Sequence, residues 1–532
     1  MNLFMVGIVI SLIAYFVIGN VISLKVKTLD DYYVADRKAP TILITGSLVA
    51  SMTSCGFFIG DCGEAYMGFF APIFIISLIA TAGYPLGATF FGKYLRRSGA
   101  LTVPEYYKQR FSDPRLQMLA GIILICICFT YMLSAIDGMQ TVMSYVTGWG
   151  RNFCLVIAWV VFTSFVVTAG SKGVLFTDTI MFMIFTSAAI LSLPAIVEQS
   201  GGWFNALEIM ADTEAVGVDN LIEFCGSTGW MYENPWDNFT WAIIYGVVWA
   251  GVMSVSPWQS SRYLMAKNEH VVTRSAAWSC VAVFTFNGVA LFAAAMIRVS
   301  NSAIDPYSTA YIWAAQNLMP TILGVIFVTG LIAAAISSAS TFLSLIGFSV
   351  VNDIMKIKDK ENRGVKISKW AILIVSLLIL FVSFFRPPMV WWLTQYSSST
   401  IAASWLIVSF TSVWWKRVTK NGAFYSMLGG FLGSVITRTI TIVAGITLPV
   451  ALDPFMVGIY CAIIGLLVGT YTSQPTEENL AQYVKMHIIP EEEKDPAEIR
   501  RTKCTLIGLA IYMVIAFILL AALWAGPIGK LA

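Results

Sequence analysis

Long apolar segments alternate with short polar stretches along the whole chain. A helix needs about 20 apolar residues to cross the hydrocarbon core of a bilayer, and fourteen segments are close to or above that length. They centre on residues 2–23, 41–69, 71–92, 117–146, 153–169, 175–197, 239–256, 275–299, 320–351, 370–386, 389–414, 423–445, 455–472 and 504–526. Backbone at membrane depth must satisfy its own hydrogen bonds, and barrel strands would be about ten residues long with alternating polarity. The pattern predicts an all-α polytopic membrane protein with about 14 transmembrane helices in a single domain, residues 1–532.

The composition argues against a soluble enzyme or binding module. Of the 532 residues, 58% are hydrophobic and only 12% are charged, which leaves too little polar surface to cover a soluble globule. The formal net charge of +3 indicates no nucleic-acid partner. Of the nine cysteines, only Cys225 lies in a polar loop, so a disulfide framework is excluded.

The distribution of Lys and Arg predicts the orientation in the membrane, because basic residues stay on the cytoplasmic side of short loops. If residues 24–40 are cytoplasmic and the loops alternate, all but five of the 33 basic residues fall in cytoplasmic loops. The exceptions are Arg151, Arg298, Arg386, Arg438 and Lys530. We therefore expect a multi-pass protein of the plasma (inner) membrane with both termini extracytoplasmic.

Two polar loops are longer than the rest. The predicted external loop 198–237 contains eight carboxylates and no Lys or Arg. It is interpreted either as the mouth of a cation pathway or as an ordinary solvated acidic loop. Residues 473–503 mix acidic and basic side chains and predict a cytoplasmic linker before the last helix.

Short polar side chains are concentrated in the ninth apolar segment. Ser337, Ser338, Ser340 and Thr341 fall on neighbouring positions of one helical face. Converging hydroxyl oxygens suit a hard monovalent cation such as Na⁺ when backbone carbonyls complete the shell. The alternative is close helix packing, since Ser and Thr also let helices approach each other.

The second apolar segment predicts an interrupted helix. Gly46, Gly56, Gly60 and Gly63 occur there among several short polar residues. An interrupted membrane helix frees backbone carbonyls, which transporters use to bind coupling ions near the midplane. The segment therefore supports the ion-binding interpretation of the Ser and Thr cluster.

Four carboxylates are predicted to lie inside the membrane, where a charged side chain is costly without a partner. Asp178 begins the sixth segment and either binds an ion or complements the positive end of its helix. Asp61 and Glu64 follow the interruption, and Asp137 lies in the middle of the fourth segment. No role is predicted for these three.

Six motifs occur in the order found in a known family. They are residues 50–60, 101–107, 173–178, 262–267, 333–338 and 415–423. On these motifs the chain resembles the sodium:solute symporters, which transport proline, pantothenate, sialic acid or sugars together with Na⁺. The resemblance implies a LeuT-like 5+5 inverted repeat. The first repeat would be 41–197 and the second 239–414, with peripheral helices in 1–23 and 423–526.

The resemblance also implies Na⁺ ligands. The principal site would use the carbonyls of Ala50, Thr53 and Ala334 and the hydroxyls of Ser337 and Ser338. A second site, present in some members, would use Asp178, Ser337, Ser340 and Thr341. No cofactor is implied beyond Na⁺ as coupling ion.

The solute is expected between the interrupted second segment and the aromatic seventh segment, where Pro257 predicts another break. Phe57 and Ser256 replace residues that bind sugar in the sugar transporters, so sugar is disfavoured. Trp258 replaces a gate tyrosine, a change that keeps the aromatic ring and loses the hydroxyl. The expected solute-binding residues are Phe57, Tyr245, Trp249, Ser256 and Trp258. A carboxylate, an amino acid or a pantothenate-like compound is expected first, and a quaternary amine such as choline is the alternative.

The function expected from these features is sodium-coupled symport of a small organic solute into the cell by alternating access. The rivals are a polytopic membrane enzyme and a transport-like sensor or channel. An enzyme would need a base near the serines, and His270 and His487 both fall in cytoplasmic loops. The solute, the number of Na⁺ ions, replacement of Na⁺ by H⁺ and the oligomeric state stay open.

Overall fold

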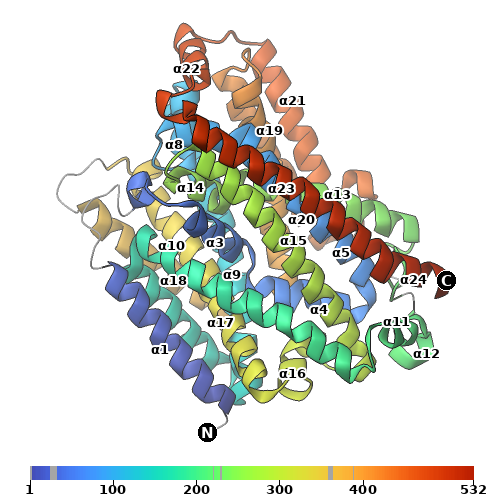
Figure 1. Cartoon of the computed structure of the whole chain (residues 1–532). Helices are drawn as coiled ribbons and strands as arrows, with labels where there is room; N and C mark the ends of the chain where they lie inside the picture. Colours follow the sequence, from blue (N-terminus) through green and yellow to red (C-terminus); the bar gives the residue numbers. More distant parts are fainter. Residues whose placement is uncertain are drawn as a thin grey trace.

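The computed structural model describes residues 3–23, 33–219, 221–227, 230–357, 363–386 and 389–531. Within these ranges the regular structure is helical, apart from one isolated β-bridge between Ala39 and Ala266. The helices form one bundle, with α1 (Leu3–Ser23) along one edge and α23 (Pro496–Leu520) across the outside of α15 (Glu269–Ser300) (Figure 1). A hydrogen bond of 2.6 Å joins Tyr512 of α23 to Thr285 of α15.

Each predicted apolar segment falls on helical backbone. The long helices at the core and around it are α3 (Thr41–Met52), α5 (Phe70–Thr81), α9 (Pro114–Thr147), α10 (Arg151–Gln199), α13 (Pro235–Val255), α17 (Thr321–Phe348), α18 (Arg363–Phe384), α19 (Val390–Trp414), α20 (Lys420–Ala444) and α21 (Pro454–Tyr471). In the described chain, ten helical stretches are long and apolar enough to cross a membrane, and three more apolar helices are shorter. The all-α polytopic fold class is confirmed, whereas the number fourteen stays a prediction.

Helix α10 contains both the fifth and the sixth predicted segments, so the expected loop between them is wrong: helical backbone continues from Arg151 to Gln199. Its two halves still contact different neighbours, as two spans would. In the first half, Trp159 Nε1 donates to Ser376 of α18 at 3.1 Å. In the second half, Asp178 accepts a hydrogen bond from Ser337 of α17.

The two predicted interruptions are confirmed. Helix α3 ends at Met52, and Thr53 is extended, with φ −80° and ψ 94°. Helical backbone resumes as η2 (Gly56–Asp61), α4 (Cys62–Glu64) and η3 (Ala65–Phe69). Helix α13 ends at Val255, and Pro257 starts α14 (Pro257–Met265). Proline has no N–H to continue the hydrogen-bond ladder, and it holds the preceding residue, Ser256, in an extended conformation with ψ 147°.

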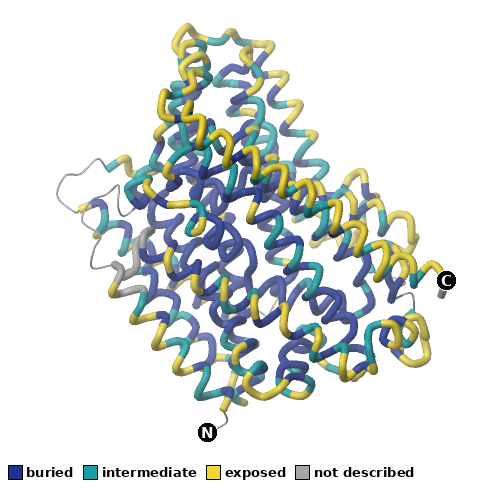
Figure 2. Tube along the Cα trace, in the orientation of Figure 1, coloured by how far each residue is buried: buried dark blue, intermediate teal, exposed yellow. Residues whose placement is uncertain are grey.

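Burial is greatest in the central helices and smallest on the outer ones (Figure 2). The outer helices expose large apolar side chains, among them Ile13 of α1, Phe381 of α18, Val443 of α20 and Ile507 of α23. Such broad apolar exposure is not tolerated in water, so these faces fit the lipid side of a membrane protein.

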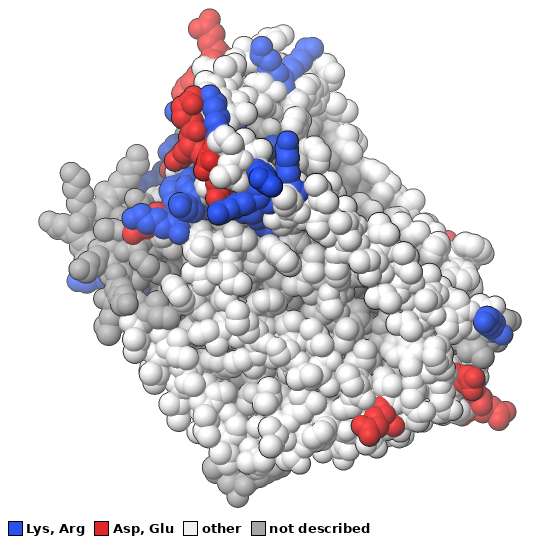
Figure 3. Space-filling model, viewed as in Figure 1, with Lys and Arg blue, Asp and Glu red and all other residues white. Residues whose placement is uncertain are grey.

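Basic residues, with acidic residues among them, gather at the end of the molecule that contains α8 (Val103–Phe111), α14 and α22 (Glu477–His487), while the middle is nearly free of charge on the visible face (Figure 3). The segment predicted as a linker forms α22 and η8 (Glu491–Lys494) and is fixed at this end. Arg97 forms a salt bridge of 2.6 Å with Glu269 and donates to the Met486 carbonyl of α22 at 2.7 Å. The segment is therefore an ordered part of the basic face.

Candidate functional site

The predicted principal Na⁺ residues come from the open end of α3 and the middle of α17, two helices that contact each other. Ala50, Thr53, Ala334, Ser337 and Ser338 are all buried. Thr53 N–H donates the last helical hydrogen bond of α3, to the Val49 carbonyl at 2.8 Å. Because α3 stops there, the carbonyls that follow lack the N–H groups that a continued helix would provide.

The two serine hydroxyls of this set differ in their partners. The Ser338 hydroxyl is fully buried and has no hydrogen-bond partner among the described residues. The Ser337 hydroxyl donates to Asp178 Oδ1 at 2.6 Å, which leaves its oxygen lone pairs able to accept. A buried hydroxyl without a partner is costly, so the Ser338 oxygen fits a bound cation. The free lone pairs of the Ser337 oxygen fit the same ion.

The residues of the predicted second site meet around Asp178, which is completely buried. Asp178 accepts hydrogen bonds from Ser337 and from Ser47, each at 2.6 Å. The Ser340 hydroxyl donates to the Ser337 carbonyl of its own helix at 2.8 Å. Asp178 also lies well inside α10, so the interpretation that it complements a helix end is wrong.

Arg262 occupies the centre of this cluster. The sequence placed it in the motif 262–267 and in a cytoplasmic loop, whereas the structure buries its side chain between the helices. Its Nη2 donates to Thr341 Oγ1 at 2.5 Å and lies 3.3 Å from Asp178 Oδ2, while its Nε donates to Ser47 at 2.7 Å. The guanidinium therefore compensates the buried carboxylate and links it to Thr341.

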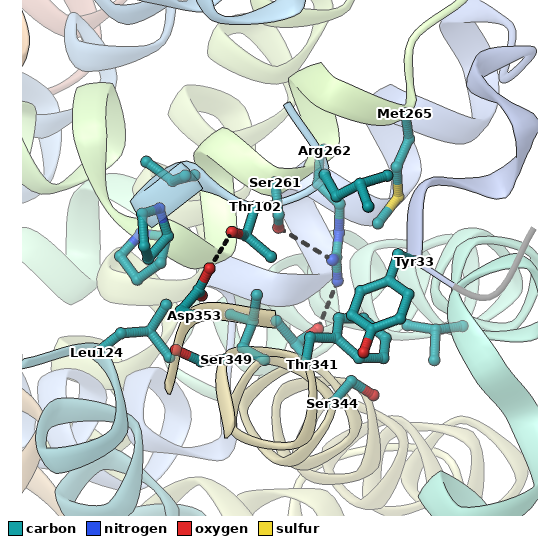
Figure 4. Close-up of a pocket in the computed structure, with 17 residues that line it drawn as sticks. Tyr33, Thr102, Leu124, Ser261, Arg262, Met265, Thr341, Ser344, Ser349 and Asp353 are labelled. Carbon is teal, nitrogen blue, oxygen red and sulfur yellow. Dashed lines mark hydrogen bonds between the residues drawn. The ribbon is translucent and has the colours of Figure 1, made fainter. Parts of the chain in front are cut away.

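A small cavity lies beside Arg262 (Figure 4). Arg262 and Thr341 line it together with Tyr33, Thr102 and Asp353. Thr102 donates to Asp353 Oδ1 at 2.6 Å. Asp178 does not line this cavity, so the Arg262 side chain separates the carboxylate from it.

A central cavity lies beside the interruption of α3. It is lined by Met52, Thr53, Ser54, Phe57, Asp61, Ile73, Ile76, Ser77, Ala80, Tyr131, Trp249, Met253, Val283, Asn287, Thr394 and Gln395. Of the five predicted solute-binding residues, the structure brings Phe57 and Trp249 to this cavity. The lining combines aromatic rings with a few polar groups, as binding sites for small molecules do.

The other three predicted residues lie elsewhere. Tyr245 lines a wider outer cavity, where its hydroxyl donates to Asp453 Oδ1 at 3.4 Å. Ser256 and Trp258 line neither cavity. Trp258 is buried against Tyr131, with ring centroids 5.4 Å apart, and Tyr131 in turn lines the central cavity.

Two hydrogen-bonded pairs form the boundary between the central and the outer cavity. Trp249 Nε1 donates to Gln395 Oε1 at 2.8 Å, and Gln395 lines both cavities. Trp391 Nε1, on the outer side, donates to Asp61 Oδ1, on the central side, at 2.9 Å.

Several lining residues were missed from the sequence. Asn287 and Gln395 are isolated amides in the eighth and eleventh apolar segments. A polar group in an apolar segment needs a partner. This rule singled out the serines, and it applies equally to Asn287 and Gln395. Tyr131 gave no signal, because aromatic residues are common in membrane helices.

Comparison with known proteins gives consistent results. The family model for the Sodium:solute symporter family matches residues 32–430. The sodium/pantothenate symporter of Haemophilus influenzae is 23% identical over 452 residues, which cover 81% of this chain and 90% of that protein. The sodium/proline symporter of Escherichia coli K12 is 22% identical over 444 residues, covering 79% and 85% respectively.

Two solved structures share the fold. A Na⁺-coupled sialic acid symporter in a substrate-bound outward-open state has a TM-score of 0.72 at 17% identity, over 90% of this chain and 99% of that chain. Mhp1, a nucleobase-cation-symport-1 family transporter in a closed conformation with bromovinylhydantoin bound, has a TM-score of 0.52 at 11% identity, over 85% and 98%. The predicted LeuT-like fold class is confirmed by these likenesses.

Proposed function

Because the chain belongs to the sodium:solute symporter family, we propose that it carries a small organic solute into the cell together with Na⁺ by alternating access. It is a multi-pass membrane transporter and not an enzyme. The observation that supports the proposal most directly is the buried Ser338 hydroxyl without a partner, on the helix that faces the open end of α3.

The principal Na⁺ site is proposed at the carbonyls of Ala50, Thr53 and Ala334 and the hydroxyls of Ser337 and Ser338. The second is proposed at Asp178, Ser337, Ser340 and Thr341. One Na⁺ crossing 100 mV releases about 2.3 kcal/mol, so one or two ions can drive accumulation of a solute. At the second site, Na⁺ would have to share Asp178 with Arg262 or displace its guanidinium.

The two interrupted spans support the proposed inverted repeat of residues 41–197 and 239–414. Each proposed repeat begins with a broken helix, at Thr53 in the first and at Ser256 in the second. Residues 1–23 and 423–526 are the proposed peripheral helices. The basic face containing α22 is proposed as cytoplasmic, which places the outer cavity and both termini outside the plasma membrane.

Reconstituted protein tests this proposal. Proteoliposomes are given an inward Na⁺ gradient, and uptake is measured for proline, pantothenate, pyruvate, glycine betaine and choline, with K⁺ replacing Na⁺ as control. We expect at least one of these solutes to accumulate only with Na⁺. Equal accumulation in both salts, or none of any solute, would overturn sodium-coupled symport.

A further inference from the structure

The central cavity has one charged side chain in its described lining, the carboxylate of Asp61. Lys, Arg and His do not occur among the residues that line it. The cavity is thus negative when Asp61 is ionised. A solute that carries only negative charge would meet a carboxylate there with no cation to offset it.

Asp61 is half-buried and has no basic partner among the described residues, in contrast to two of the fully buried carboxylates of the bundle. Asp178 is paired with Arg262, and Asp137 lies 2.7 Å from Arg386. The hydrogen-bond donor to Asp61 is neutral, the Trp391 indole, and no basic side chain of the described chain lies within ion-pair distance of the carboxylate. Charges shielded from water in proteins are normally paired, so a ligand bound in the cavity could supply the cation that the half-buried Asp61 lacks.

The rest of the lining suits an organic cation. Phe57, Tyr131 and Trp249 place three aromatic side chains in the same cavity as the carboxylate. Aromatic faces attract ammonium groups, and more strongly where water is excluded. The Gln395 Oε1 atom already accepts from Trp249, so the amide N–H groups of Gln395, like those of Asn287, can donate to a second, anionic end of the solute.

We propose that the transported solute carries a cationic nitrogen, either a quaternary ammonium or a protonated amine, and that Asp61 binds it in the central cavity. This inference rests on the proposed symport function and narrows its substrate. Betaines, choline-like compounds and zwitterionic amino acids satisfy it, whereas pantothenate and pyruvate do not.

The experiment compares wild type with Asp61→Asn in proteoliposomes under an inward Na⁺ gradient. Glycine betaine, choline and proline are the cationic or zwitterionic probes. Pyruvate, pantothenate and 3,3-dimethylbutanol, the uncharged analogue of choline, are the controls. We expect uptake of one or more ammonium probes, and a loss of affinity of about ten-fold or more in Asp61→Asn, as for loss of a charged hydrogen-bond or ion-pair partner. Asp237→Asn, which removes an exposed carboxylate at the start of α13, is the matched control and should stay within about two-fold.

A series of N-methylated glycines distinguishes a quaternary ammonium from a protonated amine as the group that Asp61 binds. Glycine, its mono- and dimethyl derivatives and glycine betaine are compared as competitors. Constant or rising affinity with methylation identifies a quaternary ammonium site, and loss of affinity identifies a site that needs an N–H donor; both support a cationic nitrogen at Asp61.

Other outcomes would overturn the inference. Na⁺-driven uptake of pyruvate or pantothenate that is equal in wild type and Asp61→Asn would refute it while leaving symport intact. Lower Na⁺ affinity without solute in Asp61→Asn, measured by tryptophan fluorescence, would make Asp61 an ion ligand instead. Absence of Na⁺-driven uptake of every probe would remove the proposed function and this inference together.

Discussion

At the scale of single residues, Ser337 and Ser338 separate the ion-binding role from the structural one. Ser338→Ala removes an oxygen without a protein partner, so folding should be unaffected, while loss of one ligand should cost about 1–3 kcal/mol of Na⁺ binding. Ser337→Ala also removes the hydrogen bond to Asp178. Both variants should raise the Na⁺ concentration for half-maximal uptake. Ser376→Ala, on the peripheral helix α18, is the control and should not.

Wild-type Na⁺ dependence in both serine variants would place the principal site elsewhere. Membrane yield and the elution profile of the purified protein should be recorded alongside. They show whether a change in Na⁺ dependence comes from binding or from folding.

Asp178→Asn tests the second ion. The amide keeps the size of the side chain but removes the charge that balances Arg262, which leaves a buried guanidinium uncompensated. We expect less charge moved per solute, or loss of coupling. The ratio of current to solute uptake in proteoliposomes measures this, and a ratio equal to that of wild type would exclude Asp178 as an ion ligand.

Substitutions of Trp249 and of Trp258 are expected to weaken solute binding to different degrees. Trp249 lines the central cavity and donates a hydrogen bond to Gln395, whereas Trp258 does not line the cavity and packs against Tyr131, which does. Trp249→Ala should therefore weaken solute binding more than Trp258→Ala, and both should leave Na⁺ binding without solute nearly intact. Competition by the transported solute measures the two affinities. If both variants kept the solute affinity of the wild type, the solute site would lie away from the interrupted helices.

At the scale of helices, the features that depend on local spacing could be predicted from the sequence. The serine face of α17 follows from helical periodicity, and the breaks at Thr53 and Ser256 follow from the nearby glycines and from Pro257. Contacts between distant helices could not be predicted. Trp249 and Gln395 are 146 positions apart, and Arg262 and Thr341 are 79 apart. Nothing in their local sequence indicates which side chains of which helices meet.

Two single elements differ from what the sequence predicted, and for one of them contacts with distant residues give the reason. Helix α10 continues through a polar stretch that the composition marked as a loop, and α22 forms in a segment interpreted as a linker. In the second case the stabilising contacts are tertiary. Arg110 Nη1, on α8, donates to the Asn479 carbonyl of α22 at 3.1 Å, and Tyr106 donates to Met486.

At the scale of the whole molecule, the concentration of Lys and Arg at one end predicts the orientation of the protein in the membrane. Single cysteines are introduced for Asp237 and for Lys416, both exposed, after Ser replaces Cys126 and Cys504. A membrane-impermeant maleimide should label the cysteine at 237 in intact cells and the cysteine at 416 only after permeabilisation. The reverse pattern would invert the proposed orientation and make the outer cavity cytoplasmic.

The central claim is that Na⁺ and solute are transported together. The most direct test is whether a gradient of the solute drives Na⁺ across the membrane. Proteoliposomes receive equal Na⁺ on both sides and an inward gradient of the panel solute that is taken up fastest, and movement of radioactive Na⁺ is followed. Because coupling is reciprocal, the solute gradient should drive Na⁺ inward, and Ser338→Ala should weaken this flux at low Na⁺. Solute entry without any solute-driven Na⁺ movement would contradict sodium-coupled symport.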